Sequence, residues 1–272
     1  MKILLIFLVL ISGCMTTTLK TESDVSRMQF LLLPEFLAMN MAEDGYRQEI
    51  KNAEKNNKLN NDKKELDKVK RIAYRLIDNI TVFREDAVDW KWEINIQDSE
   101  EVNAYCMPGG KIMVFTGILK KTDATEDEIA AILGHEISHA LREHGRERMS
   151  TALVQKVGVL GFAAYIANRG RTVGRTTSNV AIQAVALGTT LFFALPNGRE
   201  QEREADKMGI ELSARAGFNP MAAVSLWRKM GEISKSKVPE FLSTHPSNDN
   251  RISDLTAHAK KLNKLFLDSK DN

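Results

Sequence analysis

The chain has 272 residues, of which 43% are apolar, and this is enough for one full-sized hydrophobic core with additional helices. Its 38 basic and 36 acidic side chains nearly cancel. Because a nucleic-acid-binding surface usually needs a basic excess or cluster, the composition does not indicate that class of protein. A local basic run, from Lys63 to Arg75, alternates with acidic and apolar residues and is interpreted as the solvated face of a helix.

The first residues predict the compartment. A lysine precedes an unbroken apolar run over residues 3–11, which is too short to span a bilayer, since a span needs about 20 apolar residues. The run ends in ISGC, which resembles the bacterial lipoprotein signal, in which the Cys becomes the acylated N-terminus. We therefore expect residues 1–13 to be a cleaved signal peptide and Cys14 to carry a lipid anchor. An ordinary signal peptide or an uncleaved anchor is the alternative.

By the same resemblance, Met15 in place of an Asp after the Cys favours the outer membrane, with the chain facing the periplasm. The second cysteine, Cys106, then has no partner for an intrachain disulfide. It lies in an apolar run, so we interpret it as a small core residue rather than as a nucleophile.

Residues 14–64, before the main domain, are expected to form an extension. Residues 15–27 are polar and are expected to form a short tether, and the apolar residues 28–41 a helix or a packed arm. Residues 51–64 are rich in Asn and Lys and resemble a mobile link or a frayed helix end. Apolar residues then recur at helical spacing from Leu66 to Ile80, which predicts an amphipathic helix.

Further along the chain the period changes from 3.6 to 2. Alternating apolar residues between 92 and 114 predict three short strands, with a tight turn at residues 108–110 before the last. Thr125 with Glu128 three residues later forms a capping box, and the helix that it opens is expected to run from Glu126 to about Arg148.

Residues 151–196 contain two strongly apolar stretches, each shorter than a membrane span. They could form a buried helical hairpin, a cover over the cleft or a surface that dips into lipid, and we favour the first two. Residues 200–216 and 220–235 are predicted helices with Gly217 as a C-cap, and the tail from Pro246 is predicted to be helical.

The segment HEISH carries the chemistry. His135 and His139 lie four residues apart on a helix, so that both imidazoles project from one face, and Glu136 is offset enough to reach a metal-bound water. Two histidines on an amphipathic helix by chance is the alternative. Apolar neighbours around the motif would bury these polar groups without partners, which is costly unless a metal binds them. We therefore predict a zinc site, with Glu136 as general base.

A third ligand must come from elsewhere. His144 turns away from the shared face, and the residues after His139 do not fit the metzincin spacing. The downstream segment EREAD places Glu202 and Asp206 on one helix face, so that one carboxylate could bind zinc while the other holds a ligand histidine by its second nitrogen. A solvated acidic surface is the alternative for such a charge run.

HEISH followed about sixty residues later by EREAD resembles the gluzincins of the M48 peptidase family, the Ste24/HtpX/Oma1-like group, and most of all the bacterial periplasmic lipoprotein members of its Oma1-like branch. The resemblance implies an α+β, mainly helical, zincin-like domain over residues 65–265, after a tether and helical extension over residues 14–64. It implies one Zn²⁺ per chain. Its ligands would be His135, His139 and Glu202, with Glu136 as catalytic base and Asp206 in support.

Two further segments are similar to family motifs. NAYCMPGGK is similar to a strand-turn-strand that borders the cleft, which implies substrate binding at Asn103, Gly109 and Gly110 through pairing with an edge strand. THPSNDNR implies that His245 approaches the metal or the developing oxyanion and that Arg251 is its basic neighbour. A simple turn and helix start at the proline is the alternative for this segment.

The expected function is zinc-dependent hydrolysis of peptide bonds in unfolded or misassembled proteins of the bacterial envelope. A chaperone-like lipoprotein that assists outer-membrane protein assembly, with little proteolysis, is the alternative. The expected partners are such substrates, the membrane through Cys14, and either the outer-membrane assembly machinery or a second copy of the chain.

Overall fold

The computed structural model describes residues 14–167, 197–234, 239–245 and 250–270. The expected signal peptide, the apolar stretch over residues 180–195 and Pro246 lie outside these ranges. The described strands are β1 (Cys14–Met15), β2 (Gln29–Phe30), β3 (Glu93–Gln97), β4 (Ala104–Met107) and β5 (Lys111–Phe115). The described helices are α2 (Glu35–Lys55), α3 (Lys63–Ile77), α4 (Thr116–Thr122), α5 (Glu126–Leu141), α6 (His144–Ala167), α9 (Arg199–Arg215), α10 (Ala222–Ser234), α11 (Glu240–Thr244), α12 (Arg251–Lys261) and α13 (Asn263–Lys270).

The predicted α+β class with a small sheet is confirmed. Strands β3, β5 and β4 form one sheet in that order, with β3 parallel and β4 antiparallel to β5. The tight turn between β4 and β5 needs two left-handed residues, Gly109 at φ 79° and Gly110 at φ 80°. A Cβ on Gly110 would lie 2.6 Å from the Trp92 ring, so glycine also leaves room for that side chain.

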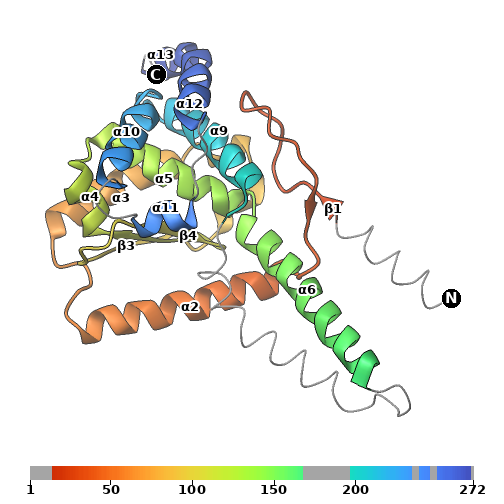
Figure 1. The fold of residues 1–272 in the computed structure, drawn as a ribbon. Helices are drawn as coiled ribbons and strands as arrows, with labels where there is room; N and C mark the ends of the chain where they lie inside the picture. The colour runs from red at the N-terminus through yellow and green to blue at the C-terminus, as the bar shows by residue number, and fades with distance from the viewer. Residues whose placement is uncertain (1–13, 168–196, 235–238, 246–249, 271–272) are drawn as a thin grey trace.

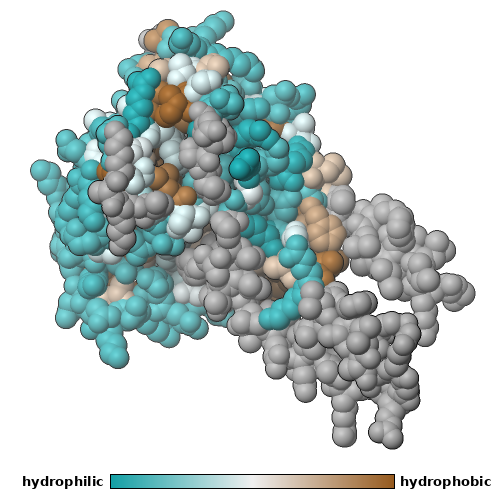
Figure 2. Space-filling model, viewed as in Figure 1, coloured by the Kyte–Doolittle hydropathy of each residue, from teal (hydrophilic) through white to brown (hydrophobic). Residues whose placement is uncertain are grey.

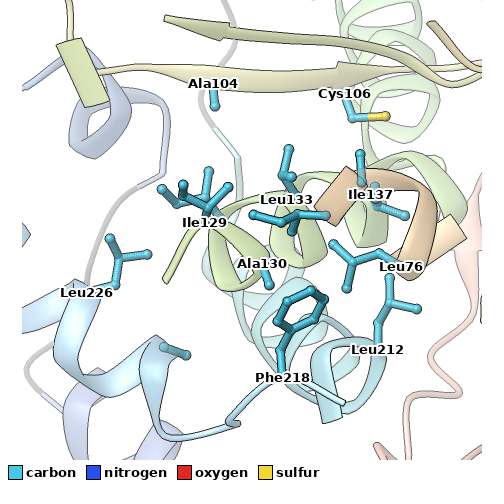
Figure 3. Packing of buried hydrophobic residues seen from close by; sticks show 14 of the residues in the cluster. Leu76, Ala104, Cys106, Ile129, Ala130, Leu133, Ile137, Leu212, Phe218 and Leu226 are labelled. Atoms are coloured by element: carbon cyan, nitrogen blue, oxygen red, sulfur yellow. The ribbon is translucent and has the colours of Figure 1, made fainter. Parts of the chain in front are cut away.

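Helix α5 lies at the centre of the molecule, between the sheet and the helices α3, α9 and α10 (Figure 1). It begins at the predicted capping box, because Thr125 accepts from the Glu128 backbone N–H and Glu128 accepts from that of Thr125. Figure 3 shows Ile129, Leu133 and Ile137 packed between Ala104 and Cys106 of β4 and the residues of neighbouring helices. The helix is therefore buried on nearly all sides.

Helices α5 and α9 approach each other closely at two glycines. A Cβ on Gly209 of α9 would lie 2.7 Å from the backbone nitrogen of His135, and a Cβ on Gly134 would lie 2.8 Å from the Gly209 carbonyl oxygen. These distances are too short for any side chain, so both positions require glycine. The close approach places the acidic residues of α9 beside the histidines of α5.

The helix predicted to continue to Arg148 ends earlier, and this boundary was wrong. Helix α5 stops at Leu141, Glu143 adopts a left-handed φ of 51°, and α6 begins at His144 in a new direction. Tertiary contacts stabilise the break, since the Gln29 amide donates to the Arg142 carbonyl at 2.6 Å and Arg84 pairs with Glu143 at 2.8 Å. These long-range bonds override a local sequence that is compatible with one helix.

The polar residues 15–27 were expected to be a tether, but they form an arm packed on the domain. Thr18, Ser23 and Val25 are buried. The Leu19 backbone N–H donates to Phe83, and the Ser23 N–H donates to Glu211 of α9 at 2.6 Å. Side chains that look solvated in the sequence are thus partners for buried polar groups of the domain. We call residues 14–33 the N-terminal arm.

Other expectations are confirmed or shifted by a few residues. The amphipathic helix, the two helices around Gly217 and the C-terminal helical tail are present as α3, α9, α10, α12 and α13. Residues 51–55 belong to α2 rather than to a mobile link, because Ala53 is buried on the helix face that covers the sheet. Among the described residues, no helix is long and apolar enough to cross a membrane.

The glycine contact between α5 and α9 generates a test of the fold. We expect Gly209→Ala to lower the free energy of unfolding by about 1–3 kcal/mol, because its Cβ would push against the α5 backbone. The matched control is Gly231→Ala in α10, where a Cβ meets nothing within 4 Å. That change should raise stability by about 0.5–1 kcal/mol through helix propensity. Chemical denaturation measures both, and a stabilising Gly209→Ala would show that the two helices are not in forced contact.

Candidate metal centre

Four donor side chains converge in the interior. His135 and His139 come from α5, Glu202 from α9 and His245 from the end of α11, and one ligand atom of each lies within 4.8 Å of the others. All four are buried. The structure thus brings together the three residues predicted as ligands and also His245, which the sequence motif implied would approach the metal or the developing oxyanion.

The distances between the donor atoms suit a small tetrahedral ion. The Nε2 atoms of His135 and His139 are 3.0 Å apart, and His139 Nε2 is 3.2 Å from Glu202 Oε1. His245 Nδ1 is 3.2 Å from His135 Nε2 and 3.0 Å from Glu202 Oε1. Ligands held at 2.0–2.1 Å around a tetrahedral ion lie about 3.3 Å from one another. The residues present therefore fit a metal ion bound by nitrogen and oxygen.

The electrostatics of the cluster favour a cation. Burial lowers the pKa of His135, but the adjacent carboxylates of Asp206 and Glu202 outweigh it and raise that pKa to about 10. Burial would raise the pKa of Glu202, but the three neighbouring histidines hold it well below its usual range. Negative charge concentrated at a low-dielectric site attracts positive charge, whether that charge is a proton or a metal ion.

Asp206 lies behind the first histidine, and Arg251, which the motif implied as a neighbour of His245, contacts two carboxylates of the site. Asp206 Oδ1 lies 3.0 Å from His135 Nδ1, on the side of the ring away from the other donors. Arg251 donates to Asp206 at 2.8 Å and to Glu202 at 3.0 Å, and its guanidinium stacks on Trp227. A carboxylate at the second nitrogen fixes the orientation of a ligand histidine. By donating to both carboxylates, Arg251 fixes the position of Asp206 relative to Glu202.

The second histidine has partners that sequence reasoning missed. His139 Nδ1 lies 2.8 Å from His144 Nδ1, and His144 Nε2 lies 2.9 Å from Glu204. The sequence predicts that His144 turns away from the face of the two ligand histidines, and the structure places it outside the donor set but in contact with His139. Burial would raise the pKa of Glu204, but hydrogen bonds from His144 and Arg27 lower it to about 2. A sequence reading could have found this pair, because His144 follows HEISH by five residues and Glu204 lies inside EREAD, and neither residue had been assigned a role.

Glu136 lies beside the donor set but is not part of it. Its side chain is 3% exposed, and its Oε1 atom makes no hydrogen bond within the described part of the chain. His245 Nε2 lies 3.6 Å from the same Oε1 atom. Burial raises the pKa of Glu136. A buried carboxylate with an oxygen that lacks a hydrogen bond is costly, and its position next to the donors suits a group that accepts the proton of a water.

A cleft opens beside Glu136. Asn103 and residues 104–106 of β4 line the cleft together with Glu136, His139 and His245. Asn103 is at this border, as expected, whereas Gly109 and Gly110 are absent from the lining and serve the turn instead. Cys106 is buried and burial raises its pKa, which agrees with a core residue rather than a nucleophile.

The outer edge of β4 is available for pairing. Among the described strands, β4 pairs only with β5. The Phe115 N–H donates to the Asn103 carbonyl, so in this antiparallel pair the backbone groups of Ala104 and Cys106 point away from β5. The Asn103 side chain accepts from the Ala104 N–H at 2.9 Å and thereby caps the free edge. An extended peptide could replace that cap.

Comparison with known proteins agrees with the site. The profile of peptidase family M48 matches residues 63–259. The mitochondrial metalloendopeptidase OMA1 of Arabidopsis thaliana is 34% identical over 65% of this chain and 33% of its own length. The same enzyme of Saccharomyces cerevisiae is 30% identical over 65% of this chain and 49% of its own.

A bacterial relative is similarly close. The beta-barrel assembly-enhancing protease of Yersinia pestis is 30% identical over 68% of this chain and 38% of its own length. The chain thus spans between about a third and a half of the length of these relatives. The family match contains all four converging donors and Glu136, and the chain belongs to peptidase family M48.

Proposed function

We propose that the chain is a zinc-dependent endopeptidase that holds one Zn²⁺. The observation that supports this best is the convergence of His135, His139 and Glu202 beside the buried carboxylate of Glu136. Two imidazoles and one carboxylate form the ligand set of catalytic zinc sites that keep a fourth position for water. Imidazole-rich sites of this kind suit zinc better than magnesium or calcium, which prefer oxygen ligands.

The metal, Glu136 and His245 would each contribute a different step to the hydrolysis. When bound, zinc would lower the pKa of a water and polarise the carbonyl of the scissile bond. Glu136 accepts the proton of the attacking water and returns it to the leaving amine nitrogen. His245 Nδ1 lies at the fourth corner of the donor set, where the water would bind, so His245 would first have to move aside. From a position beside the site, its ring would stabilise negative charge on the substrate.

The proposed substrate is an extended, unfolded polypeptide. The free edge of β4 at the cleft presents the backbone groups of Ala104 and Cys106, and a substrate strand would pair with them without regard to its side chains. A folded protein rarely exposes an extended segment whose backbone groups are free to pair with β4, so unfolded or misassembled proteins would be cleaved preferentially. This preference supports a role in protein quality control.

We propose that the enzyme works at the bacterial envelope, anchored through a lipid on Cys14 and facing the periplasm at the outer membrane. The support is the lipoprotein-like signal and the surface next to Cys14, where Met15 and Met28 are exposed. Figure 2 shows apolar side chains gathered beside β1 on a mainly hydrophilic face. An apolar patch beside a lipid anchor would rest on the membrane. The relative named for beta-barrel assembly makes an outer-membrane assembly machinery a candidate partner.

The role of Glu136 generates the decisive experiment. We expect Glu136→Gln to retain the bound zinc but to cleave an unfolded protein such as casein about 10²–10⁴ times more slowly, because the proton acceptor is lost. The matched control is Glu126→Gln on the same helix, whose carboxylate pairs with Arg71 at the surface and which should cleave at the parent rate. Metal analysis and a gel-based cleavage assay measure both. Zinc in every variant with cleavage in none would instead favour the assembly factor that binds clients and rarely cuts.

The ligand role of Glu202 generates a separate prediction. Glu202→Gln removes one negative charge from a site with the shape retained, and we expect its zinc content after dialysis to fall from one per chain to nearly none. Glu200→Gln, two residues earlier on α9, changes an exposed carboxylate paired with Arg203 and should keep its zinc. Equal zinc content in the two variants would exclude Glu202 as a ligand.

A further inference from the structure

The second histidine of the motif is held by a buried relay of side chains. His139 Nδ1 lies 2.8 Å from His144 Nδ1, and His144 Nε2 lies 2.9 Å from the Glu204 carboxylate. His144 has no exposed surface, and Glu204 is 7% exposed. The relay is distinct from the Asp206 contact with His135, and the proposed mechanism does not use it.

The direction of the relay follows from what each atom can donate. An ionised carboxylate only accepts hydrogen bonds, so Glu204 accepts one from the N–H at His144 Nε2. A neutral His144 then has a lone pair at Nδ1, which accepts from His139 Nδ1–H. His139 in turn has its lone pair at Nε2, the atom that lies 3.0 Å from His135 Nε2 and 3.2 Å from Glu202. The relay therefore selects the tautomer of His139 that can bind a metal through Nε2.

The carboxylate at the end of the relay is fixed by the N-terminal arm. Arg27 donates to both oxygens of Glu204, at 2.9 and 3.1 Å, and also binds Glu147. Arg142, which has no exposed surface, donates to Glu204 at 3.2 Å and to the Arg27 carbonyl at 3.0 Å. Its other nitrogen donates to Thr16 and Thr18 of the arm. The arm is thus connected to His139 by a chain of hydrogen bonds that runs through Arg27, Glu204 and His144.

We infer that His144 and Glu204 are positioning residues for the metal ligand His139, and that Arg27 of the N-terminal arm completes this support. The relay holds the His139 ring in one orientation and one tautomer, so the donor set is formed before the metal arrives. Partners of this kind at the second nitrogen of a ligand histidine typically contribute 10- to 100-fold in metal affinity. The inference rests on the proposed metal site but makes a separate claim.

Two substitutions at the relay separate hydrogen bonding from packing. His144→Phe keeps a ring of similar size and removes both nitrogens, and we expect the dissociation constant for Zn²⁺ to rise by about 10- to 100-fold. His144→Asn can offer an amide oxygen near the position of Nδ1, so it should recover most of that affinity. Competition with a chromophoric chelator measures the constant in the full chain in detergent. The visible spectrum of the Co²⁺-loaded protein reports the ligand geometry and should shift in the Phe variant and return in the Asn variant.

Further variants keep the test informative if His144→Phe does not fold. Arg27 is a third exposed, so Arg27→Met should fold, and we expect it to weaken Zn²⁺ binding by about 3- to 10-fold through a less fixed Glu204. The matched control is Ser138→Ala, one residue from His139, whose hydroxyl donates to the Gly134 carbonyl of its own helix and to no other group in the described ranges. It should keep the parent affinity and spectrum.

The outcomes distinguish this inference from the proposed function. Parent-like affinity and spectrum in His144→Phe, or equal losses in the Phe and Asn variants, would overturn the positioning role while the zinc site stands. A parent-like Arg27→Met would overturn the part played by the arm. A folded parent that binds neither Zn²⁺ nor Co²⁺ would instead overturn the proposed function itself.

Discussion

The site depends on one contact, the close crossing of α5 and α9. Gly134 and Gly209 bring the two backbones to a distance that no side chain would permit. At this distance a carboxylate as short as Asp206 reaches the far nitrogen of His135, while Glu202 reaches the near nitrogens of both histidines. A crossing even one methyl group wider would separate these atoms, and the donors would no longer converge. The two glycines are therefore required for the donor atoms to converge, although neither glycine is itself a ligand.

Bringing so many polar groups into the interior has a large desolvation cost, and the structure offsets it in two ways. Arginines pair with the outer carboxylates, as Arg251 does with Asp206 and Arg27 with Glu204. The inner donors lie close enough together to share a bound cation, and that cation, a proton on His135 or a metal ion, compensates the charge of Glu202. Metal binding and the folding of this region are therefore coupled, because the ion supplies the last compensating charge.

Local sequence patterns predicted the parts of this molecule that depend on local rules. The 3.6-residue period, the Thr125 capping box and the glycine turn each specify an element by themselves, and the HEISH spacing specifies two ligands. The third ligand required a resemblance, because a pattern cannot show which distant acid meets the histidines. The break after Leu141 and the packing of the N-terminal arm could not be predicted, since bonds from Gln29 and Arg84 across more than fifty residues determine them.

The break after α5 also allows acids from two faces of α9 to serve one site, since α9 carries acids at the alternate positions 200, 202, 204 and 206. Residues 202 and 206 lie one helical turn apart and face α5 together, whereas residue 204 points about 200° away from residue 202. On an unbroken α5, His144 would likewise point about 140° from His139, and neither group could serve the site. The left-handed residue Glu143 redirects the chain, so that His144 returns to His139 and meets Glu204 on the other side of α9. The deviation from a regular helix is thus what allows both faces of α9 to orient the ligands of one metal ion.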